Sequence, residues 1–216
     1  MSTGVIFDFH NTLVRPDSLT AWLVEAAHDT ARSPVDVDAV RPVLREVWSR
    51  ASLRYPDGAW DLDPARHKQV FLDVLTQESP CPPDVASALY DAMPAHWVAV
   101  DGAVALLTSL RERGVRLAIV SNIAVDIRPR LAELGMLRFF DTVVLSYEVG
   151  VVKPDRRLFQ RAVDDLRVAP SRCVMVGDSP GSDGGAVAAG VCTILVPVVD
   201  DRPQLDRAAA LLAGVG

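Results

Sequence analysis

The sequence predicts an α/β protein in which a doubly wound parallel sheet carries an all-helical domain inserted after its first strand. Three observations lead to this fold class. Short apolar runs alternate with helical patterns from residue 115 to the end of the chain. A separate apolar run, residues 5–7, lies near the N-terminus. Between them, residues 15–97 hold several helical patterns broken by prolines. Alternation of strands and helices is typical of parallel pairing with right-handed crossovers.

Apolar periodicity gives the elements of the sheet domain in order. We expect its strands at residues 5–7, 115–121, 141–146, 172–178 and 192–198. We expect its helices at residues 126–135, 154–168, 182–190 and 202–214. The first of these helices ends at a glycine, as helices commonly do. The predicted sheet domain is therefore residues 1–14 and 98–216, and the inserted helical domain is residues 15–97.

The composition of the chain limits its surroundings and its partners. Half of the 216 residues are hydrophobic, which is enough for a sizeable core. The net charge of -6 argues against a nucleic-acid partner. Cys81, Cys173 and Cys192 are too scattered for a disulfide framework or a zinc site. The sequence has no signal-peptide pattern and no apolar run of membrane-spanning length. We expect a cytoplasmic protein with no membrane partner, and the oligomeric state stays open.

Polar side chains follow four of the predicted strands. These residues are Asp8, His10, Ser121, Asn122, Lys153, Asp178 and Asp183. Each alone has an ordinary interpretation as a helix cap, a turn residue or a solvated side chain. Together they converge on the carboxyl ends of the strands, where open α/β sheets bind their ligands. The sequence therefore predicts a functional site at this edge.

The residue types at this edge suit phosphoryl transfer. Asp8 is the candidate nucleophile, since carboxylates form aspartyl-phosphates in such reactions. Asp8 and Asp178 would share a Mg²⁺ ion, a hard cation that takes carboxylate oxygens together with phosphate and water. The Ser121 hydroxyl and nearby main-chain N–H groups would hold phosphate oxygens. Lys153 would balance the negative charge, and charge neutralisation is most of what this chemistry requires.

Four motifs resemble those of the haloacid dehalogenase-like hydrolase superfamily, in its phosphatase branch with a helical cap of the C1 type. They are "DFHNTLV", "AIVSN", "SYEVGVVKPDRRLF" and "VMVGDSPGSDGGAVAAG", and they extend over nearly the whole chain. The resemblance implies a Rossmann-like core with residues 15–97 as the cap that selects the substrate. It also implies hydrolysis of a small-molecule phosphate monoester.

The same resemblance implies roles for individual residues. Asp8 would be the nucleophile, and Ser121, Asn122 and Lys153 would bind the substrate phosphate. The Mg²⁺ ligands would be Asp8, Asp178 and the main-chain carbonyl of His10. Asp183 would not bind the metal itself but would hold the metal ligands or Lys153 in position.

His10 departs from the common phosphatase pattern, which has an aspartate two residues after the nucleophile. Three interpretations follow. His10 replaces that aspartate as general acid and base, for which an imidazole is suited near neutral pH. Alternatively, the protein is a weak enzyme or a non-catalytic binding protein. Alternatively, it cleaves carbon–halogen or carbon–phosphorus bonds, although the retained "GDSPGSD" favours a metal site and Lys68 is the only lysine of the predicted cap.

The predicted cap leaves the substrate open among sugar phosphates, small phosphorylated acids, nucleotides and aryl phosphates. Its tryptophans are more typical of a core than of an aromatic substrate slot; they are Trp22, Trp48, Trp60 and Trp97. Arginines that would suit a second anionic group of the substrate are Arg45, Arg54 and Arg66.

Overall fold

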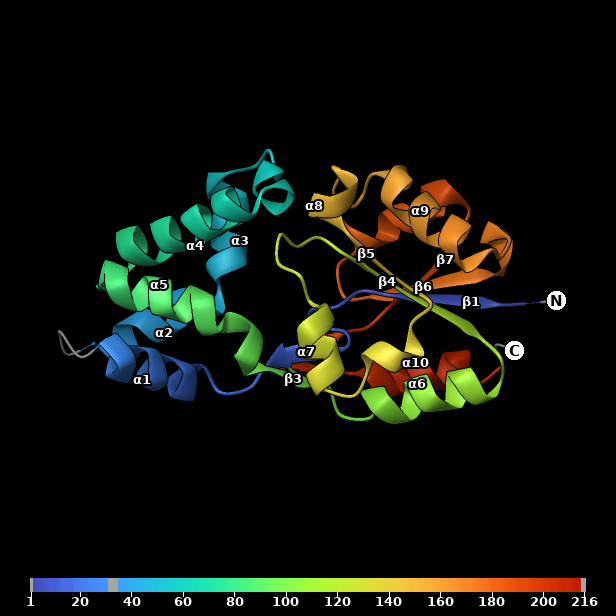
Figure 1. The fold of residues 1–216 in the computed structure, drawn as a ribbon, viewed down its shortest axis with the longest axis horizontal. Coiled ribbons are helices and arrows are strands. Elements are labelled where there is room, and N and C mark those ends of the chain that lie inside the picture. Colours follow the sequence, from blue (N-terminus) through green and yellow to red (C-terminus); the bar gives the residue numbers. More distant parts are fainter. Residues whose placement is uncertain (1, 31–34, 215–216) are drawn as a thin grey trace. The chain divides into compact units, whose positions relative to one another are not determined.

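A computed structural model describes residues 2–30 and 35–214 of the chain. Within this part, five parallel strands form one sheet in the order β5-β4-β1-β6-β7 (Figure 1). The strands are β1 (Gly4–Phe7), β4 (Arg116–Ser121), β5 (Thr142–Leu145), β6 (Cys173–Gly177) and β7 (Cys192–Leu195). The predicted doubly wound α/β fold is confirmed.

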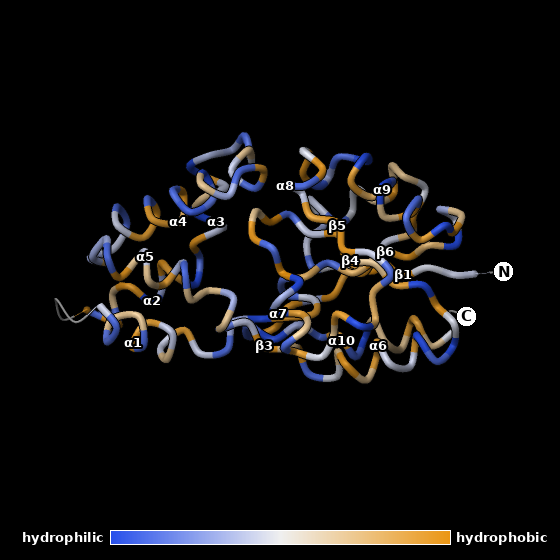
Figure 2. Tube along the Cα trace, in the orientation of Figure 1, coloured by the Kyte–Doolittle hydropathy of each residue, from blue (hydrophilic) through white to orange (hydrophobic). Residues whose placement is uncertain are grey.

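Helices cover both faces of this sheet. One face packs against α9 (Arg156–Leu166) and the 3-10 helix η5 (Asp183–Ala189), with α6 (Ala103–Glu112) and α10 (Leu205–Leu212) on the other (Figure 1). The central strand β1 is fully buried, and Figure 2 shows the sheet as a largely apolar layer. Burial on both faces explains why these strands read as continuous apolar runs in the sequence.

The structure differs from the predicted elements at several places. Within the predicted helix 182–190, Asp183–Ala189 form a 3-10 helix, in which two successive glycines disfavour a regular α-helix. The last strand of the sheet ends at Leu195, and β8 (Val198–Val199) pairs antiparallel with β9 (Arg202–Pro203). The last helix, predicted for residues 202–214, therefore begins only at Leu205. Two helices were not predicted, α6 and the single turn α8 (Ser146–Val149). The buried residues of α6 have the spacing of a single helical face, so the sequence did carry a signal for this helix; they are Ala103, Leu106, Leu107 and Leu110.

The chain divides into two compact units, which we call the core unit and the helical unit. The core unit comprises Met1–Arg15 and Val98–Gly216, and the helical unit comprises Pro16–Trp97. The predicted ranges include residues 1, 31–34 and 215–216, which lie outside the described part. Two short strands, β2 (Val14–Pro16) and β3 (Trp97–Ala99), form a separate two-stranded sheet.

The helical unit is built from five α-helices within its described residues. They are α1 (Leu19–Thr30), α2 (Val37–Arg45), α3 (Val47–Arg54), α4 (Pro64–Glu78) and α5 (Pro83–Ala92), with 3-10 turns η1 (Ala59–Leu62) and η2 (Met93–His96). Prolines begin two of these helices, where a missing N–H costs nothing. At α4, the side chain of Asp63 also accepts a hydrogen bond from the N–H of Arg66.

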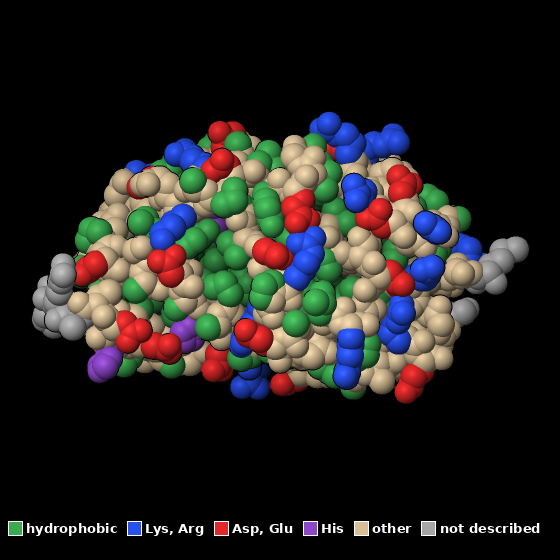
Figure 3. Space-filling view, viewed as in Figure 1, with side chains coloured by type: hydrophobic (Ala, Val, Ile, Leu, Met, Phe, Trp, Pro, Cys, Tyr) green, Lys and Arg blue, Asp and Glu red, His purple; other side chains and the backbone are tan. Residues whose placement is uncertain are grey.

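The helices and the surface of the described residues bear on possible partners. None of these helices combines the length and the apolar character that crossing a bilayer requires. On the face that Figure 3 draws, acidic and basic side chains are interspersed over α9. Two ion pairs of this region are Arg157–Asp155 and Arg161–Asp165.

Candidate active site

The candidate site lies at the carboxyl end of β1, where the order of the sheet reverses. Asp8 follows β1 directly, and its N–H donates to the carbonyl of Val176 at 2.8 Å, which extends the pairing with β6. Ser121 ends β4 on one side of β1, and Asp178 follows β6 on the other. The chain passes from β1 to β4 and β5 on one side, and then crosses from β5 to β6 on the other side of β1. Such a reversal of strand order is the usual ligand site of an open α/β sheet.

A tight turn after Asp8 positions the next polar residues. Asn11 adopts a left-handed backbone conformation with φ of 53°, which asparagine tolerates better than most residues. Its N–H donates to the carbonyl of Val14 at 2.8 Å, and the N–H of Leu13 donates to the carbonyl of Phe9 at 2.9 Å. The side chain of Asn11 also hydrogen-bonds the carboxylate of Asp178. The turn therefore links the β1 motif to the β6 motif.

Lys153 joins two of the carboxylates. Its Nζ lies 2.6 Å from Oδ1 of Asp8 and 2.7 Å from Oδ1 of Asp183. The side chain of Lys153 is 3% exposed, and that of Asp183 is fully buried. A buried ion pair is stable only when each charge is partnered, and this lysine meets both carboxylates at hydrogen-bond distance.

Two glycines make room for this arrangement. A Cβ atom added to Gly177 would collide with the carboxylate of Asp183. A Cβ atom added to Gly185 would lie 2.7 Å from both Cα and the carbonyl oxygen of Pro154, the residue after Lys153. Asp183 is further fixed by the N–H of Ser179, which donates to its Oδ2 at 2.9 Å. The glycines thus allow η5 to approach the lysine closely.

The charges of the site are unbalanced. Burial raises the pKa of Asp8 to about 7, against the opposing attraction of Lys153 and with repulsion from Asp183 and Asp178. The pKa of Asp178 is also raised, by burial and by Asp183. Burial by itself would lower the pKa of Lys153, but the charges of Asp8 and Asp183 raise it above its usual value. Lys153 therefore stays charged, and its single positive charge is shared among the crowded carboxylates.

A comparison with known proteins identifies the family. The profile of the haloacid dehalogenase-like hydrolase family matches residues 3–190. This chain belongs to that family. The matched range contains every residue that the sequence assigned to the site, from Asp8 to Asp183.

Several members of the family are similar to this chain. Phosphoserine phosphatase of Thermus thermophilus is 43% identical over 96 residues, which are 44% of this chain and 39% of that protein. This chain thus aligns with less than half of that relative. Glyceraldehyde 3-phosphate phosphatase of Methanothermobacter thermautotrophicus is 30% identical over 203 residues, which are 91% of this chain and 86% of that protein.

A solved structure of the family supports the fold. The crystal structure of an HAD phosphatase from Thermococcus onnurineus superimposes with a TM-score of 0.67 and covers 99% of each chain. The two sequences are 23% identical. Both chains therefore share the fold of haloacid dehalogenase-like hydrolases.

The donor set of the site fits a hard divalent cation. Carboxylate oxygens of Asp8, Asp178 and Asp183 all lie within 4.8 Å of one another. Three carboxylates that face one ammonium group leave two negative charges unbalanced when all are ionised. A divalent cation would balance them, and oxygen ligands are those that Mg²⁺ prefers. Asp183, which already contacts Lys153 and the N–H of Ser179, is better placed as a support than as a ligand.

His10 lies two residues after Asp8 and is half-buried. Burial and, to a smaller extent, the positive charge of Lys153 lower the pKa of His10 to about 4. Its ring lies 5.0 Å from the ring of Phe9, centroid to centroid. At neutral pH the imidazole of the free site is therefore uncharged, which is the form that accepts a proton.

The structure also shows features that sequence patterns did not indicate. The side chain of Asn122 contacts the main chain of Lys153, with distances of 2.7 and 3.1 Å. The hydroxyl of Thr12 is fully buried, and no described residue hydrogen-bonds it. Gly177 and Gly185 have steric roles. Of these features, only the two glycines could have been noticed in the sequence, because Gly177 directly precedes Asp178 and Gly185 closely follows Asp183.

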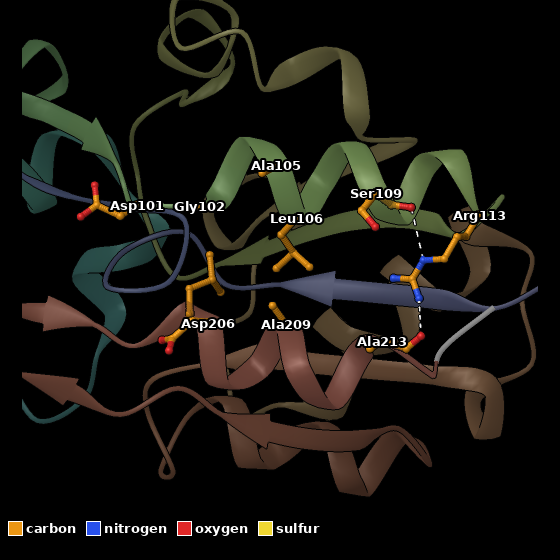
Figure 4. A pocket seen from close by; sticks show the side chains of 10 residues that line it. Asp101, Gly102, Ala105, Leu106, Ser109, Arg113, Asp206, Ala209 and Ala213 are labelled. Atoms are coloured by element: carbon orange, nitrogen blue, oxygen red, sulfur yellow. Dashed lines mark hydrogen bonds between the residues drawn. The ribbon is translucent and has the colours of Figure 1, made fainter.

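A pocket of about 480 Å³ lies elsewhere in the core unit, between α6 and α10 (Figure 4). Its wall is lined by Leu106 and Ala209, among others, and Arg113 closes one end. The guanidinium of Arg113 donates to the main-chain carbonyls of Ser109, Leu212 and Ala213. The guanidinium of Arg113 is thus hydrogen-bonded by main-chain carbonyls. None of the residues that the sequence assigned to the site lines this pocket.

Proposed function

We propose that this protein hydrolyses phosphate monoesters of small molecules, with Asp8 as the nucleophile. The observation that carries this proposal is the buried Asp8 at the reversal point of the sheet, with Lys153 at 2.6 Å and Asp178 close by. Membership of the haloacid dehalogenase-like hydrolase family supports it, as do the phosphatase names of two similar proteins.

The proposed reaction has two steps. In the first, a carboxylate oxygen of Asp8 attacks phosphorus, the bond from phosphorus to the ester oxygen breaks, and an aspartyl-phosphate forms. In the second, water attacks that phosphorus, which releases inorganic phosphate and restores Asp8. The ammonium of Lys153 stays in place throughout and stabilises the charge that gathers on the phosphate oxygens.

His10 would move the proton in both steps. It would donate to the leaving ester oxygen in the first step and accept from the attacking water in the second. The lowered pKa of His10 in the free site favours the second role. Leaving groups such as nitrophenolate need no proton, so they should depend on His10 less than alkyl alcohols do.

Magnesium would be held by Asp8, Asp178 and the main-chain carbonyl of His10. When bound, it would supply positive charge to the phosphate oxygens and to the crowded carboxylates. Ser121 and the main-chain N–H of Asn122 would contact the remaining phosphate oxygens. The helical unit would serve as the cap that selects the substrate, as lids of phosphate sites do.

A steady-state assay with variants tests the proposal. The assay would follow phosphate release from p-nitrophenyl phosphate and from a panel of sugar, nucleoside and amino-acid phosphates, with Mg²⁺ and after chelation by EDTA. We expect Mg²⁺-dependent turnover, and Asp8→Asn should lose more than about 10²-fold in kcat because no carboxylate is left to attack. The matched control is Asp206→Asn, which changes an exposed carboxylate of the same unit.

Two further results would decide among the alternatives. Beryllofluoride with Mg²⁺, an analogue of a phosphorylated carboxylate, should bind the wild type and not Asp8→Asn. Near-normal turnover in Asp8→Asn would end the nucleophile assignment. No turnover of any ester by the folded wild type would favour a binding protein, and release of halide from a 2-haloacid without metal would favour a dehalogenase.

A further inference from the structure

We propose that the side chain of Asn122 is a positioning residue, which fixes the main chain of Lys153 so that its ammonium reaches Asp8 and Asp183. This inference rests on the proposed function and extends it. The resemblance to the family assigns Asn122, directly after Ser121, to binding of the phosphate. In the structure, the side chain of Asn122 contacts the lysine segment.

The contact is a reciprocal pair of hydrogen bonds. The N–H of Lys153 donates to Oδ1 of Asn122 at 2.7 Å, and Nδ2 of Asn122 donates to the carbonyl of Lys153 at 3.1 Å. A main-chain N–H can only donate and a carbonyl can only accept, so the pair also defines the orientation of the amide. Asparagine is therefore suited to this position, whereas alanine offers neither group.

A second clamp of the same kind lies beside the first. The hydroxyl of Ser146 accepts from the N–H of Ile123 at 2.9 Å and donates to the carbonyl of Ile123 at 3.1 Å. Asn122 is thus tied to the segment between α8 and α9, and Ile123 is tied to the first residue of α8. Only the Asn122 clamp holds the lysine itself, so the two clamps differ in what their loss should do.

The clamp matters because a lysine side chain is long and flexible. The four-carbon stem of Lys153 must hold its ammonium between two buried carboxylates, at a cost in rotamer entropy. If its main chain were also free to shift, the ammonium would no longer meet both partners. A displacement of about 1 Å in a catalytic site can cost on the order of 10²-fold in rate.

The test compares Asn122→Ala with Ser146→Ala. Each variant removes at least two hydrogen bonds between a side chain and the main chain, so both should melt at lower temperature than the wild type. With p-nitrophenyl phosphate and Mg²⁺, we expect Asn122→Ala to lose about 10- to 100-fold in kcat, as outer partners of catalytic groups typically do. Ser146→Ala should lose less than about 3-fold. In a Lys153→Ala background, Asn122→Ala should cause no further loss, because its effect passes through Lys153.

A spectroscopic measurement reads the position of Lys153 without activity. The chain has only two lysines, Lys68 and Lys153, so ¹³C labelling at Cε gives two lysine signals. We expect Asn122→Ala to move the Lys153 signal towards that of an exposed lysine and to leave the Lys68 signal unchanged. Ser146→Ala should leave both signals close to their wild-type positions.

These outcomes separate the inference from the proposed function. An unchanged Lys153 signal together with wild-type kcat in folded Asn122→Ala would overturn the positioning role. Equal losses of kcat in Asn122→Ala and Ser146→Ala at equal melting temperature would overturn it too, as would an additive loss in the Lys153→Ala background. If the wild type hydrolyses no ester, the proposed function fails, and the shift of the Lys153 signal still decides the positioning role.

Discussion

The core unit and the helical unit each bury a group of polar side chains, and the two groups differ in how their charges are matched. In the helical unit, His67 is buried, with its Nδ1 2.7 Å from the hydroxyl of Tyr90 and its Nε2 3.6 Å from Asp61. Aromatic rings surround it, and Trp48 stacks on it at a centroid distance of 4.3 Å. In the core unit, three carboxylates face Lys153 alone.

The match between charges distinguishes a buried polar group that binds a ligand from one that only supports the fold. The Asp61–His67–Tyr90 group links one acid, one imidazole and one hydroxyl inside an aromatic cluster, so its polar atoms are partnered within the unit. Burial raises the pKa of Tyr90 to about 12, which keeps the phenol neutral. The group at β1 has an excess of negative charge that its own residues cannot match. Such an excess of negative charge fits the binding of a cation, whereas burial alone indicates no ligand.

The largest loss of kcat that we expect distinguishes His10 of the core unit from His67 of the helical unit. His10→Ala should lose about 10²- to 10⁴-fold in kcat for alkyl phosphates, because no group remains to transfer the proton. The loss for p-nitrophenyl phosphate should be smaller. His10→Asp should keep or raise activity, since it restores the common pattern of the family.

The control for His10 is His67→Gln, which should lower the melting temperature and leave kcat within about 3-fold. Equal rates for wild type and His10→Ala, across pH 5 to 8 and for both classes of ester, would remove His10 from the mechanism. If His10→Asp were then the only active form, the protein would be a weak enzyme or a binding protein.

The next effect compares the two lysines of the chain. Lys153→Ala should lose about 10²-fold in kcat, because one preorganised charge is commonly worth about 3 kcal/mol. Lys68→Ala, in the helical unit, removes an exposed ion pair with Asp91, in which the two charged atoms lie 2.7 Å apart. Exposed pairs contribute little, so its stability and its kcat should stay close to wild type. A similar kcat for both variants would mean that Lys153 has no electrostatic role.

A smaller effect concerns the steric requirement at η5. Gly185→Ala should lower kcat about 10-fold and lower the melting temperature, because its Cβ displaces Pro154 and with it Lys153. Gly181→Ala is the matched control, since a Cβ there meets no atom within 4 Å. The kinetics and thermal melting of both variants would check this. Normal activity in Gly185→Ala would show that the lysine tolerates a shift of its neighbour.

The smallest effect is a pH dependence of stability in the metal-free protein. The pKa of Asp8 is raised to about 7, so the folded state binds more protons than the unfolded state, and Asp8 destabilises the fold as pH rises from about 4 to 7. The pKa of His10 is lowered to about 4 in the folded protein, whereas it is near 6.5 in the unfolded chain. His10 therefore stabilises the fold as pH rises between these two values. In the wild type the two slopes oppose each other.

Variants should separate these slopes. His10→Asn should lose stability as pH rises from 4.5 to 7, and Asp8→Asn should gain it, each by on the order of 1 kcal/mol. Urea unfolding at several pH values, with EDTA present, measures both. Added Mg²⁺ should stabilise the wild type more at pH 7.5 than at pH 5, since protonated carboxylates bind metal poorly. Slopes of the same sign in both variants would contradict the assignment of these pKa shifts.

Most of the sheet could be predicted because its strands are short apolar runs bounded by turns. The helix α6 was missed although its buried residues have the spacing of one helical face. The 3-10 helix η5 was expected to be α-helical because apolar spacing does not reveal the local effect of two glycines. The role of Asn122 could not be predicted either. Its partner, Lys153, is 31 residues away in the sequence, and no spacing rule connects them.

The sequence by itself determined which side chains gather at the carboxyl edge of the sheet. Parallel strands bring their ends to one edge whatever lies between them, so residues that follow apolar runs, such as Asp8 and Asp178, must converge. It also determined that His10 stands where the family commonly has aspartate. Only the tertiary structure decided the partners and the protonation of these groups. Lys153 reaches Asp8 across 145 residues of chain, and the pKa shifts depend on burial and on distances that exist only after folding.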